Sequence, residues 1–246
     1  MIIPGDVQRF RDSLQWAVAA LSAGLAALFL SWQLLASVNF LYPLWYEVIG
    51  IDATIREYGP QNLHRRDFER TDKAERVRLF AALVEAINGR GADPATLRYH
   101  DRQGRTLDRL LTSPEIQHLR DVAVLVGYFK LAGWVACVIC LLQIWILRRN
   151  RVRAPPGRSF LLRGCAVLAV LGLVLWLTGA EALFYRLHVW VFPQGHQWYF
   201  YYQDSLMTMM MQAPVLFAWI AAEWLASALL LLLVLFPVAR KTGLLV

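Results

Sequence analysis

The sequence predicts an all-α polytopic membrane protein: a four-transmembrane-helix bundle with a small extracytoplasmic insert between helices 1 and 2. Three observations predict it. The 246 residues are 58% hydrophobic and 17% charged, with a mean hydropathy of +0.42, whereas soluble domains are nearer half apolar and a quarter charged. The apolar residues form four runs long enough to cross a bilayer, which takes about 20 residues. The basic residues gather at the ends of these runs.

The four apolar runs cover residues 14–38, 121–147, 161–187 and 214–238. The first run follows Arg9 and Arg11, as the core of a signal peptide would. Its apolar stretch is longer than the roughly 7–15 residues of such a core. We therefore interpret it as a retained membrane anchor.

The basic residues predict the orientation. Six arginines, with no acidic residue among them, lie between the second and third runs: Arg148, Arg149, Arg151, Arg153, Arg158 and Arg163. Further basic pairs precede the first run and follow the fourth, at Arg240 and Lys241. Cytoplasmic loops carry such an excess, so both termini are expected on the cytoplasmic side of the membrane. The same layout explains the net charge of +7 without nucleic-acid binding.

This orientation divides the chain into three parts. Residues 1–38 form the N-terminus and transmembrane helix 1, and residues 39–120 form the extracytoplasmic insert. Residues 121–246 contain transmembrane helices 2–4, with an extracytoplasmic aromatic segment at 188–213. The insert exceeds the length of the short loops that obey the charge rule, so its mixed charges do not oppose this topology.

The insert has local signals of a folded unit. Asp72 and Glu75 resemble a capping box that opens a helix. The expected apolar stripe of that helix is Val77, Phe80, Ala81, Val84 and Ile87. Asn88-Gly89 supplies a stop. The polar turn 101–104 predicts a weak hairpin within residues 97–107. Ser113-Pro114 then begins a helix that continues into the second run.

The three cysteines do not support a redox function. Cys137 and Cys140 have C-x-x-C spacing, which suggests a disulfide-generating enzyme, but they lie deep in the second run, where a thiolate is disfavoured. Cys165 lies near the start of the third run. We interpret all three as small packing residues.

Ionisable residues within the runs have two interpretations. Lys130, Glu181 and Glu223 are costly in hydrocarbon, so each is expected to face a partner or a cavity. Lys130 could pair with either glutamate, or these residues could belong to an active site. Glu181, Tyr185 and His188 share one helix face by their spacing.

Two histidines give a sharper hypothesis. His118 precedes the outer end of the second run and His188 follows the outer end of the third. On neighbouring helices, 8–10 Å apart, their rings could meet or flank a substrate group. Asp121 lies three residues after His118 and could fix its tautomer. The alternative is that both histidines are structural residues at the membrane interface.

An aromatic stretch follows His188. Residues 187–202 are rich in Trp, Tyr and Phe, with a turn at Pro193 and Gly195. We expect this stretch and the Met-rich run 205–211 to form a groove for acyl chains, although interface anchoring or ordinary packing would use the same residues. The candidate substrate-binding residues are Glu115, Tyr185, Trp190, Phe192, Trp198 and Met207.

Two motifs resemble one known family. The first is E-x-x-H-L-x-D-V, from Glu115 to Val122, leading into the second run. The second begins at the end of the third run: His188, Phe192, Pro193, Gly195 and Trp198, then Ser205-Leu206-Met207 and Pro214. Together with the four-helix plan, these motifs resemble the bacterial lipoprotein intramolecular transacylase (Lit) family over most of the chain.

The resemblance implies a reaction. Family members move the sn-2 acyl chain of a diacylglyceryl lipoprotein to its N-terminal cysteine amine, giving a lyso-form lipoprotein, with no cofactor, metal or external acyl donor. His118 and His188 match the family's two histidines. Leu187 and His196 depart from the family's pattern.

The residues fit that chemistry. Only the neutral amine attacks an ester, and a histidine is a suitable base near neutral pH. We assign His188 as the catalytic base. We assign His118, oriented by Asp121, to share the proton or stabilise the oxyanion. No covalent acyl-enzyme is expected.

Two other classes remain as alternatives. One is a non-catalytic lipid-binding membrane scaffold whose histidines are structural. The other is a metal-dependent lipid hydrolase with His118, His188, Glu115 and His196 as ligands. The expected partners are the lipoprotein substrate and membrane lipids, and the oligomeric state stays open.

Overall fold

The computed structural model describes residues 4–243. It describes their side chains except those at positions 4, 5, 160, 161, 163, 167, 168, 171, 175 and 180. The side chain of Arg163 and some other side chains of the third apolar run are therefore not described.

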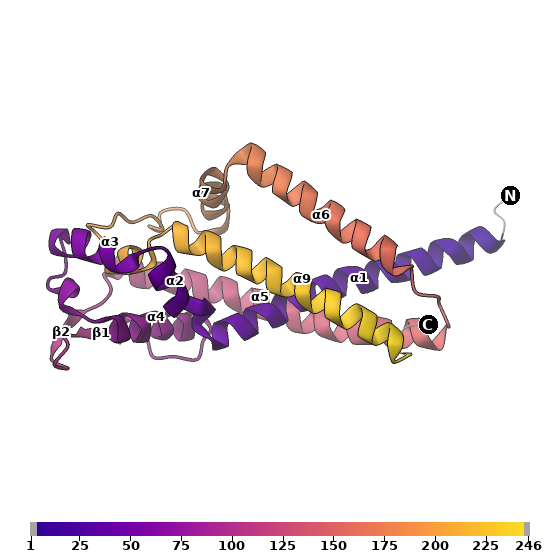
Figure 1. Ribbon diagram of the computed structural model, residues 1–246, viewed down its shortest axis with the longest axis horizontal. Coiled ribbons are helices and arrows are strands. Elements are labelled where there is room, and N and C mark those ends of the chain that lie inside the picture. The colour runs from indigo at the N-terminus through magenta and orange to yellow at the C-terminus, as the bar shows by residue number, and fades with distance from the viewer. Residues whose placement is uncertain (1–3, 244–246) are drawn as a thin grey trace. The chain divides into compact units, whose positions relative to one another are not determined.

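The described chain is mostly helical, with one two-stranded sheet (Figure 1). Its long helices are α1 (Pro4–Ser37), α5 (Ser113–Arg149), α6 (Gly157–Thr178) and α9 (Val215–Lys241). The shorter helices are α2 (Tyr42–Val48), α3 (Ile51–Tyr58), α4 (Lys73–Ile87), α7 (Ala180–Val191) and α8 (Leu206–Met211). The strands are β1 (Arg98–His100) and β2 (Thr106–Arg109).

Among the described residues, three helices are long and apolar enough to cross a membrane: α1, α5 and α9. They contain the first, second and fourth predicted runs. The prediction of apolar helices at these three places is therefore confirmed in length and composition.

The third run differs from the single helix expected over 161–187. The structure divides it into α6 and α7, which Figure 1 labels separately. Gly179 stands between them with φ 74° and ψ 137°. Glycine adopts a positive φ without the steric cost that a Cβ would add. The break places Tyr185 and His188 on a short helix of their own.

The chain divides into two compact units. Unit 1 comprises residues 1–33, 129–177 and 223–246, and unit 2 comprises residues 34–128 and 178–222. Each long helix α1, α5 and α9 contributes to both units. The predicted insert, the two histidines and the aromatic stretch all lie in unit 2.

Aromatic side chains pack the helices of unit 1. Phe29 of α1 lies edge-on to Phe129 and Trp134 of α5, with ring centroids 6.3 and 5.1 Å apart. Trp224 of α9 donates from its indole nitrogen to the carbonyl of Leu28 at 2.8 Å. Tight contact needs a glycine at position 133, since a Cβ there would lie 2.3 Å from Cγ of Phe29.

In unit 2, the insert contains the predicted helix and hairpin. Asp72 caps α4 by accepting from the backbone N–H of Glu75 at 2.8 Å. The Glu75 carboxylate does not complete the capping box, because it accepts from the N–H of His100 at 2.9 Å. β1 and β2 pair antiparallel across the turn that Asp101 begins.

The buried face of α4 differs from the predicted stripe. Phe80 and Val84 are buried as expected, but the rest of the face is Arg76, Leu79 and Leu83. An arginine was not expected in a core position. It is buried there because other elements of the insert supply acceptors for its guanidinium.

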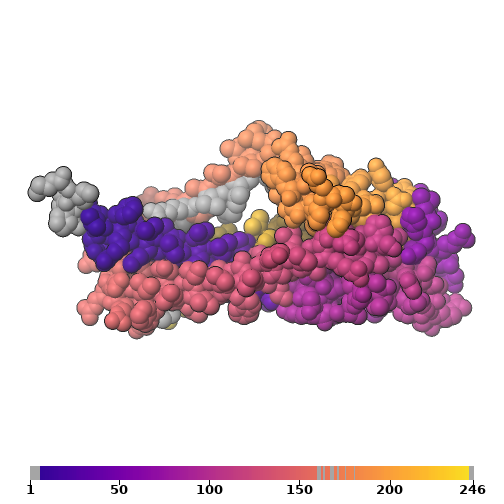
Figure 2. Space-filling model, turned by 180° about the vertical axis from the view of Figure 1, so that it is seen from behind, coloured from indigo at the N-terminus to yellow at the C-terminus, as the bar shows by residue number. Residues whose placement is uncertain are grey.

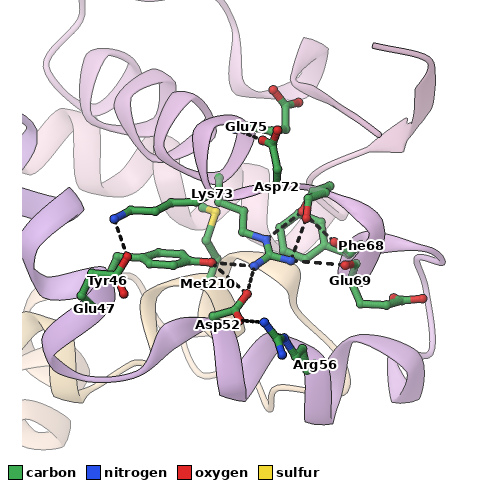
Figure 3. Close-up of polar contacts among 12 residues, drawn as sticks. Tyr46, Glu47, Asp52, Arg56, Phe68, Glu69, Asp72, Lys73, Glu75 and Met210 are labelled. Carbon is green, nitrogen blue, oxygen red and sulfur yellow. Dashed lines mark hydrogen bonds and ion pairs between the residues drawn. The ribbon is translucent and has the colours of Figure 1, made fainter. Parts of the chain in front are cut away.

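Arg76 forms the centre of a polar cluster, which we call the Arg76 cluster: Arg76, Tyr46, Asp52, Glu69 and Thr71. Figure 3 labels three of its members, Tyr46, Asp52 and Glu69. The Arg76 side chain is 2% exposed. Its Nη1 donates to the Tyr46 hydroxyl at 2.6 Å and to Asp52 Oδ1 at 2.7 Å. Nε donates to Thr71 Oγ1 at 2.8 Å, and Nη2 donates to the carbonyls of Thr71 and Glu69. The cluster thereby ties α4 to α2 and α3.

The short helix α8 is completely buried within unit 2. All six of its residues are buried, with Met209 and Met210 0% exposed. The Tyr42 hydroxyl donates to the carbonyl of Met210 at 2.9 Å. The Met-rich run therefore packs in the core, rather than forming an open groove, because α3 and α2 cover it.

Candidate active site

The structure brings the two predicted histidines together. His118 lies in the second turn of α5 and His188 in the last turn of α7. Their ring centroids are 6.3 Å apart, with the ring planes inclined at 31°. Both rings contact Phe192, at centroid distances of 4.9 and 5.2 Å. We call His118, His188 and Phe192 the histidine site.

One ring nitrogen of His188 is fixed by the backbone. Nδ1 lies 2.7 Å from the carbonyl oxygen of Phe184, one helical turn earlier. A carbonyl only accepts, so Nδ1 carries the proton and Nε2 is left with a lone pair. Burial lowers the pKa of His188 below its usual value of 6.5, although the bond to Phe184 opposes this shift. His188 is therefore a neutral base near neutral pH.

His118 has a less satisfied environment. Within the described part of the chain, its Nδ1 is buried and makes no hydrogen bond. Phe192 and Phe200 flank its ring, at centroid distances of 4.9 and 6.2 Å. Buried polar atoms are usually paired, and an unpaired one is a signal of a functional role.

Asp121 does not hold His118 as expected. Its Oδ2 lies 2.7 Å from Nδ1 of His196, and its Oδ1 accepts from Nε2 of Gln117 at 3.0 Å. The spacing of three residues places Asp121 on the same side of α5 as His118, but it does not compel contact between them. The loop after α7 brings His196 within hydrogen-bonding distance of Asp121.

Glu115 is buried, not open to substrate. Its side chain accepts from the Ser205 hydroxyl and from the hydroxyl and N–H of Thr112. Ser205 in turn caps α8, accepting from the N–H of Thr208 at 2.8 Å. Glu115 therefore ties the start of α5 to α8, three residues before His118.

The other predicted residues fall into two groups. Trp198 lies 4.8 Å from the His188 ring, and Tyr185 lies 5.6 Å from the Trp198 ring. Trp190 points outward and is 77% exposed, while Met207 is 5% exposed inside α8. Figure 2 shows the segment of α7 and the stretch after it, in orange, at the molecular surface.

A cavity of about 200 Å³ adjoins the histidine site. Its lining is Asp121, Val124, Leu125, Tyr128, Val191, Phe192 and Pro193. Phe192 thus forms a wall of the cavity and touches both imidazole rings. The arrangement can hold a small group with one polar end beside the two histidines.

No metal-binding group is found among the described side chains, where no three His, Cys, Asp or Glu residues converge. The ligand set of the alternative metal-dependent hydrolase, His118, His188, Glu115 and His196, is divided between different contacts. Glu115 bonds to Ser205, and His196 bonds to Asp121.

Sequence reasoning missed several residues of the site. The partner role of His196 was missed, although its departure from the family's pattern was a signal. Phe184 acts through its backbone carbonyl, for which a side chain gives no signal. Phe200 and Ser205 are fixed by contacts across the fold, with His118 and Glu115.

Comparisons with known proteins agree with the resemblance. The family model of the lipoprotein intramolecular transacylase Lit matches residues 17–213. An in meso structure of the membrane integral Lit from Bacillus cereus, carrying a histidine-to-arginine mutation, has a TM-score of 0.66 at 16% identity, covering 96% of this chain and 93% of that chain. A second structure of that protein has a TM-score of 0.63 at 15% identity, covering 95% and 98%. A search of curated protein sequences finds no match. At these identities the structures show a shared fold.

Proposed function

The chain belongs to the lipoprotein intramolecular transacylase Lit family, and from this premise we propose that it is a membrane acyltransferase. It moves the sn-2 acyl chain of a diacylglyceryl lipoprotein to the amine of the N-terminal cysteine. The product is a lyso-form lipoprotein. One observation carries the proposal: two imidazoles from different helices lie 6.3 Å apart, and the bond of one Nδ1 to a backbone carbonyl leaves the lone pair of that ring on Nε2.

His188 acts as the base in this proposal. Its Nδ1–H is held by Phe184, so Nε2 accepts a proton from the substrate ammonium. The neutral amine then attacks the ester carbonyl, and the bond to the glycerol oxygen breaks. His188 returns the proton to that oxygen. After the attack the nitrogen carries one more proton than the amide needs, and this proton passes to water, so the steps balance without an acyl-enzyme or an added acyl donor.

His118 stabilises the developing oxyanion or shares the proton. Its buried Nδ1, which has no partner among the described residues, supports this role, since a donor held in an apolar site stabilises a developing charge more than one in water does. Phe192 and Trp198 exclude water from the rings. Tyr185 and Trp190 extend the aromatic surface for the lipid.

Because the reaction is intramolecular, the protein has to supply little beyond substrate binding and proton transfer. Amine and ester belong to one molecule, so most of the entropy cost of joining them is already met. The protein must hold the lipid and move one proton. Glu115 and Ser205 contribute by fixing the start of α5 against α8, and Met207 is buried in α8, so we assign these residues to positioning.

We propose that four helices cross a bacterial inner membrane, with α6 as the crossing that joins α5 to the histidine site. Its 22 residues would span about 33 Å at 1.5 Å per residue. The arginines between α5 and α6 support a cytoplasmic loop there, with both termini cytoplasmic and the site extracytoplasmic.

Mass spectrometry of lipopeptides tests this function. A bacterial host that makes diacylglyceryl lipoproteins should form the lyso form only when it expresses this chain. His188→Ala should lower the conversion rate about 100-fold to 10,000-fold, as expected for loss of a general base. His64→Ala is the matched control, since the His64 side chain is 51% exposed.

Each alternative class has its own outcome. Full conversion by a folded His188→Ala variant would favour the non-catalytic scaffold. Loss of conversion with a chelator, and its return with a divalent metal, would favour the metal-dependent hydrolase. Release of free fatty acid in place of the N-acylated product would also contradict the transacylase.

A further inference from the structure

The cavity beside the histidine site combines one carboxylate with an apolar wall. Asp121 supplies the carboxylate, and the other lining residues are apolar or aromatic. A carboxylate in such surroundings is costly unless it has partners. The lining therefore favours a ligand that brings a positive charge on an apolar body.

The Asp121 carboxylate has two hydrogen-bond partners among the described residues, and neither carries a permanent charge. Gln117 donates to Oδ1 at 3.0 Å and His196 lies 2.7 Å from Oδ2. The Asp121 side chain is 14% exposed. A carboxylate has about four acceptor positions, so these two bonds leave room for a further donor. Gln117 is neutral, and His196 is charged only when protonated.

The cavity is also in the right place for a reacting group. Phe192 lines it and contacts the rings of both His118 and His188. A group bound at Asp121 therefore lies near Phe192, whose ring also contacts both imidazoles. The cavity has a volume of about 200 Å³, which admits a small polar group and a few methylenes. This volume is below the roughly 300–1,000 Å³ of sites that enclose a whole ligand.

We propose that this cavity binds the α-ammonium group of the substrate's N-terminal cysteine. Asp121 accepts a hydrogen bond from the ammonium, while Val124, Leu125 and Val191 contact the neighbouring methylenes. The inference rests on the proposed function and names the part of the site that recognises a free amine. His196 is a positioning residue that holds the carboxylate.

A primary ammonium on a diacyl lipid has two sources. One is the N-terminus of a diacylglyceryl peptide, and the other is the phosphatidylethanolamine headgroup. Phosphatidylethanolamine carries a phosphate two carbons from its nitrogen. That phosphate would have to enter apolar lining near a carboxylate, at a cost in desolvation and repulsion. The structure therefore favours the peptide amine.

The test compares two unreactive lipopeptides on the purified full-length protein in micelles. Both carry dialkyl ether chains, which cannot transfer, and one has a free amine while the other is N-acetylated. The unmodified protein should bind the free-amine peptide about tenfold more tightly, as expected for a charge-assisted hydrogen bond. Asp121→Asn should remove that preference, and Asp121→Glu should restore part of it.

Matched variants separate the site from general effects. Asp93→Asn removes the same charge from a carboxylate that is 51% exposed and pairs with Arg120, and should keep the preference. Val124→Lys breaks no hydrogen bond in the protein and adds a cation to the lining, so it should weaken binding of the free-amine peptide alone. This variant keeps the test decisive if Asp121→Asn does not fold, because a preference that survives it would overturn the inference.

The outcomes for the inference and the function differ. A folded Asp121→Asn variant with an unchanged preference would overturn the ammonium site, while conversion of an ester lipopeptide by the unmodified protein would still support the proposed function. A preference that depends on Asp121 without conversion would leave the amine site and reject the transacylase. Displacement of the peptide by phosphatidylethanolamine, but not by phosphatidylcholine, would overturn the assignment to the peptide amine.

Discussion

The Arg76 cluster and the histidine site are two polar groupings within unit 2, and they satisfy their polar atoms differently. Arg76 is 2% exposed, and each of its three guanidinium nitrogens donates to an oxygen within 3.4 Å. In the histidine site, His118 Nδ1 is buried without a partner among the described residues. His188 has one nitrogen bonded to a carbonyl and the other left as a base.

This difference indicates that the Arg76 cluster stabilises the fold, whereas the histidine site is suited to proton transfer. A fully bonded guanidinium cannot take a ligand without losing a bond that it already has. An imidazole nitrogen without a hydrogen bond can accept or donate a proton in a reaction, but burying it without a partner lowers the stability of the fold. The expectation is that substitutions in the Arg76 cluster change stability before activity, and that substitutions in the histidine site do the reverse.

The largest effect on stability is expected from Arg76→Met. The methionine fills much of the same volume but removes the guanidinium donor of the Asp52 carboxylate and of the Glu69 and Thr71 carbonyls. Of these three acceptors, only Asp52 keeps another charged partner, Arg56. Breaking such a pair costs about 3–5 kcal/mol in a dry interior, and less here because Asp52 is 38% exposed. Chemical unfolding of the purified protein should show the loss.

A control for Arg76→Met is Arg56→Met. Arg56 also pairs with Asp52, but its side chain is 75% exposed. Exposed ion pairs contribute about 0–1 kcal/mol. Equal losses in the two variants would contradict the view that burial makes the Arg76 cluster structural.

Ser205→Ala should have a smaller effect that reaches both regions. It removes the N-cap of α8 and one hydrogen bond to the buried Glu115 carboxylate. Loss of an N-cap costs about 1 kcal/mol, and the lost bond to a charged group adds to it. Because Glu115 lies one turn before His118, conversion should also fall, with a larger change in kcat than in KM.

Thr112→Val is the matched variant for Ser205→Ala. Thr112 Oγ1 donates to the same carboxylate at 2.7 Å but caps no second helix. It should destabilise the protein less. Unchanged kcat in both variants would argue that Glu115 does not position His118.

Local signals in the sequence predicted much of the insert. Asp72 as a cap of α4 and the turn that Asp101 begins were read from short-range patterns, which depend on neighbouring residues alone. The approach of His118 and His188 followed from their places at the ends of apolar runs. Each of these inferences needed only spacing and a helix geometry.

Contacts across the chain could not be read in this way. The burial of Arg76 depends on acceptors supplied by other elements, and the bond between Asp121 and His196 joins residues 75 positions apart. Gly179 ends a helix inside an apolar run because of its backbone conformation, which composition does not reveal. Spacing limits which residues can meet, and the tertiary fold chooses among them.

The smallest expected effect is a difference in how low pH affects the stability of the insert and the activity of the histidine site. In the insert, burial opposes ionisation of Glu75, but hydrogen bonds from Arg78 and His100 hold its pKa below the usual 4.5. A carboxylate with a lowered folded-state pKa contributes stability above its unfolded pKa and loses it as the pH falls through the folded value. Glu75→Gln should therefore reduce the loss of stability between about pH 5 and pH 3, measured by chemical unfolding.

The loss of activity at low pH should depend on a different group, His188. Burial lowers the pKa of His188 below 6.5, so the neutral base persists to mildly acidic pH and is lost as the pH falls through that lowered value. The acid limb of kcat/KM, which reports the protein without substrate, should lie below pH 6.5, and Glu75→Gln should leave it in place. An acid limb that moves with Glu75→Gln would mean that unfolding of the insert, and not protonation of His188, limits activity in acid. The pH dependence of activity would then report the stability of the insert, and the distinction between a structural insert and a chemical histidine site would be wrong.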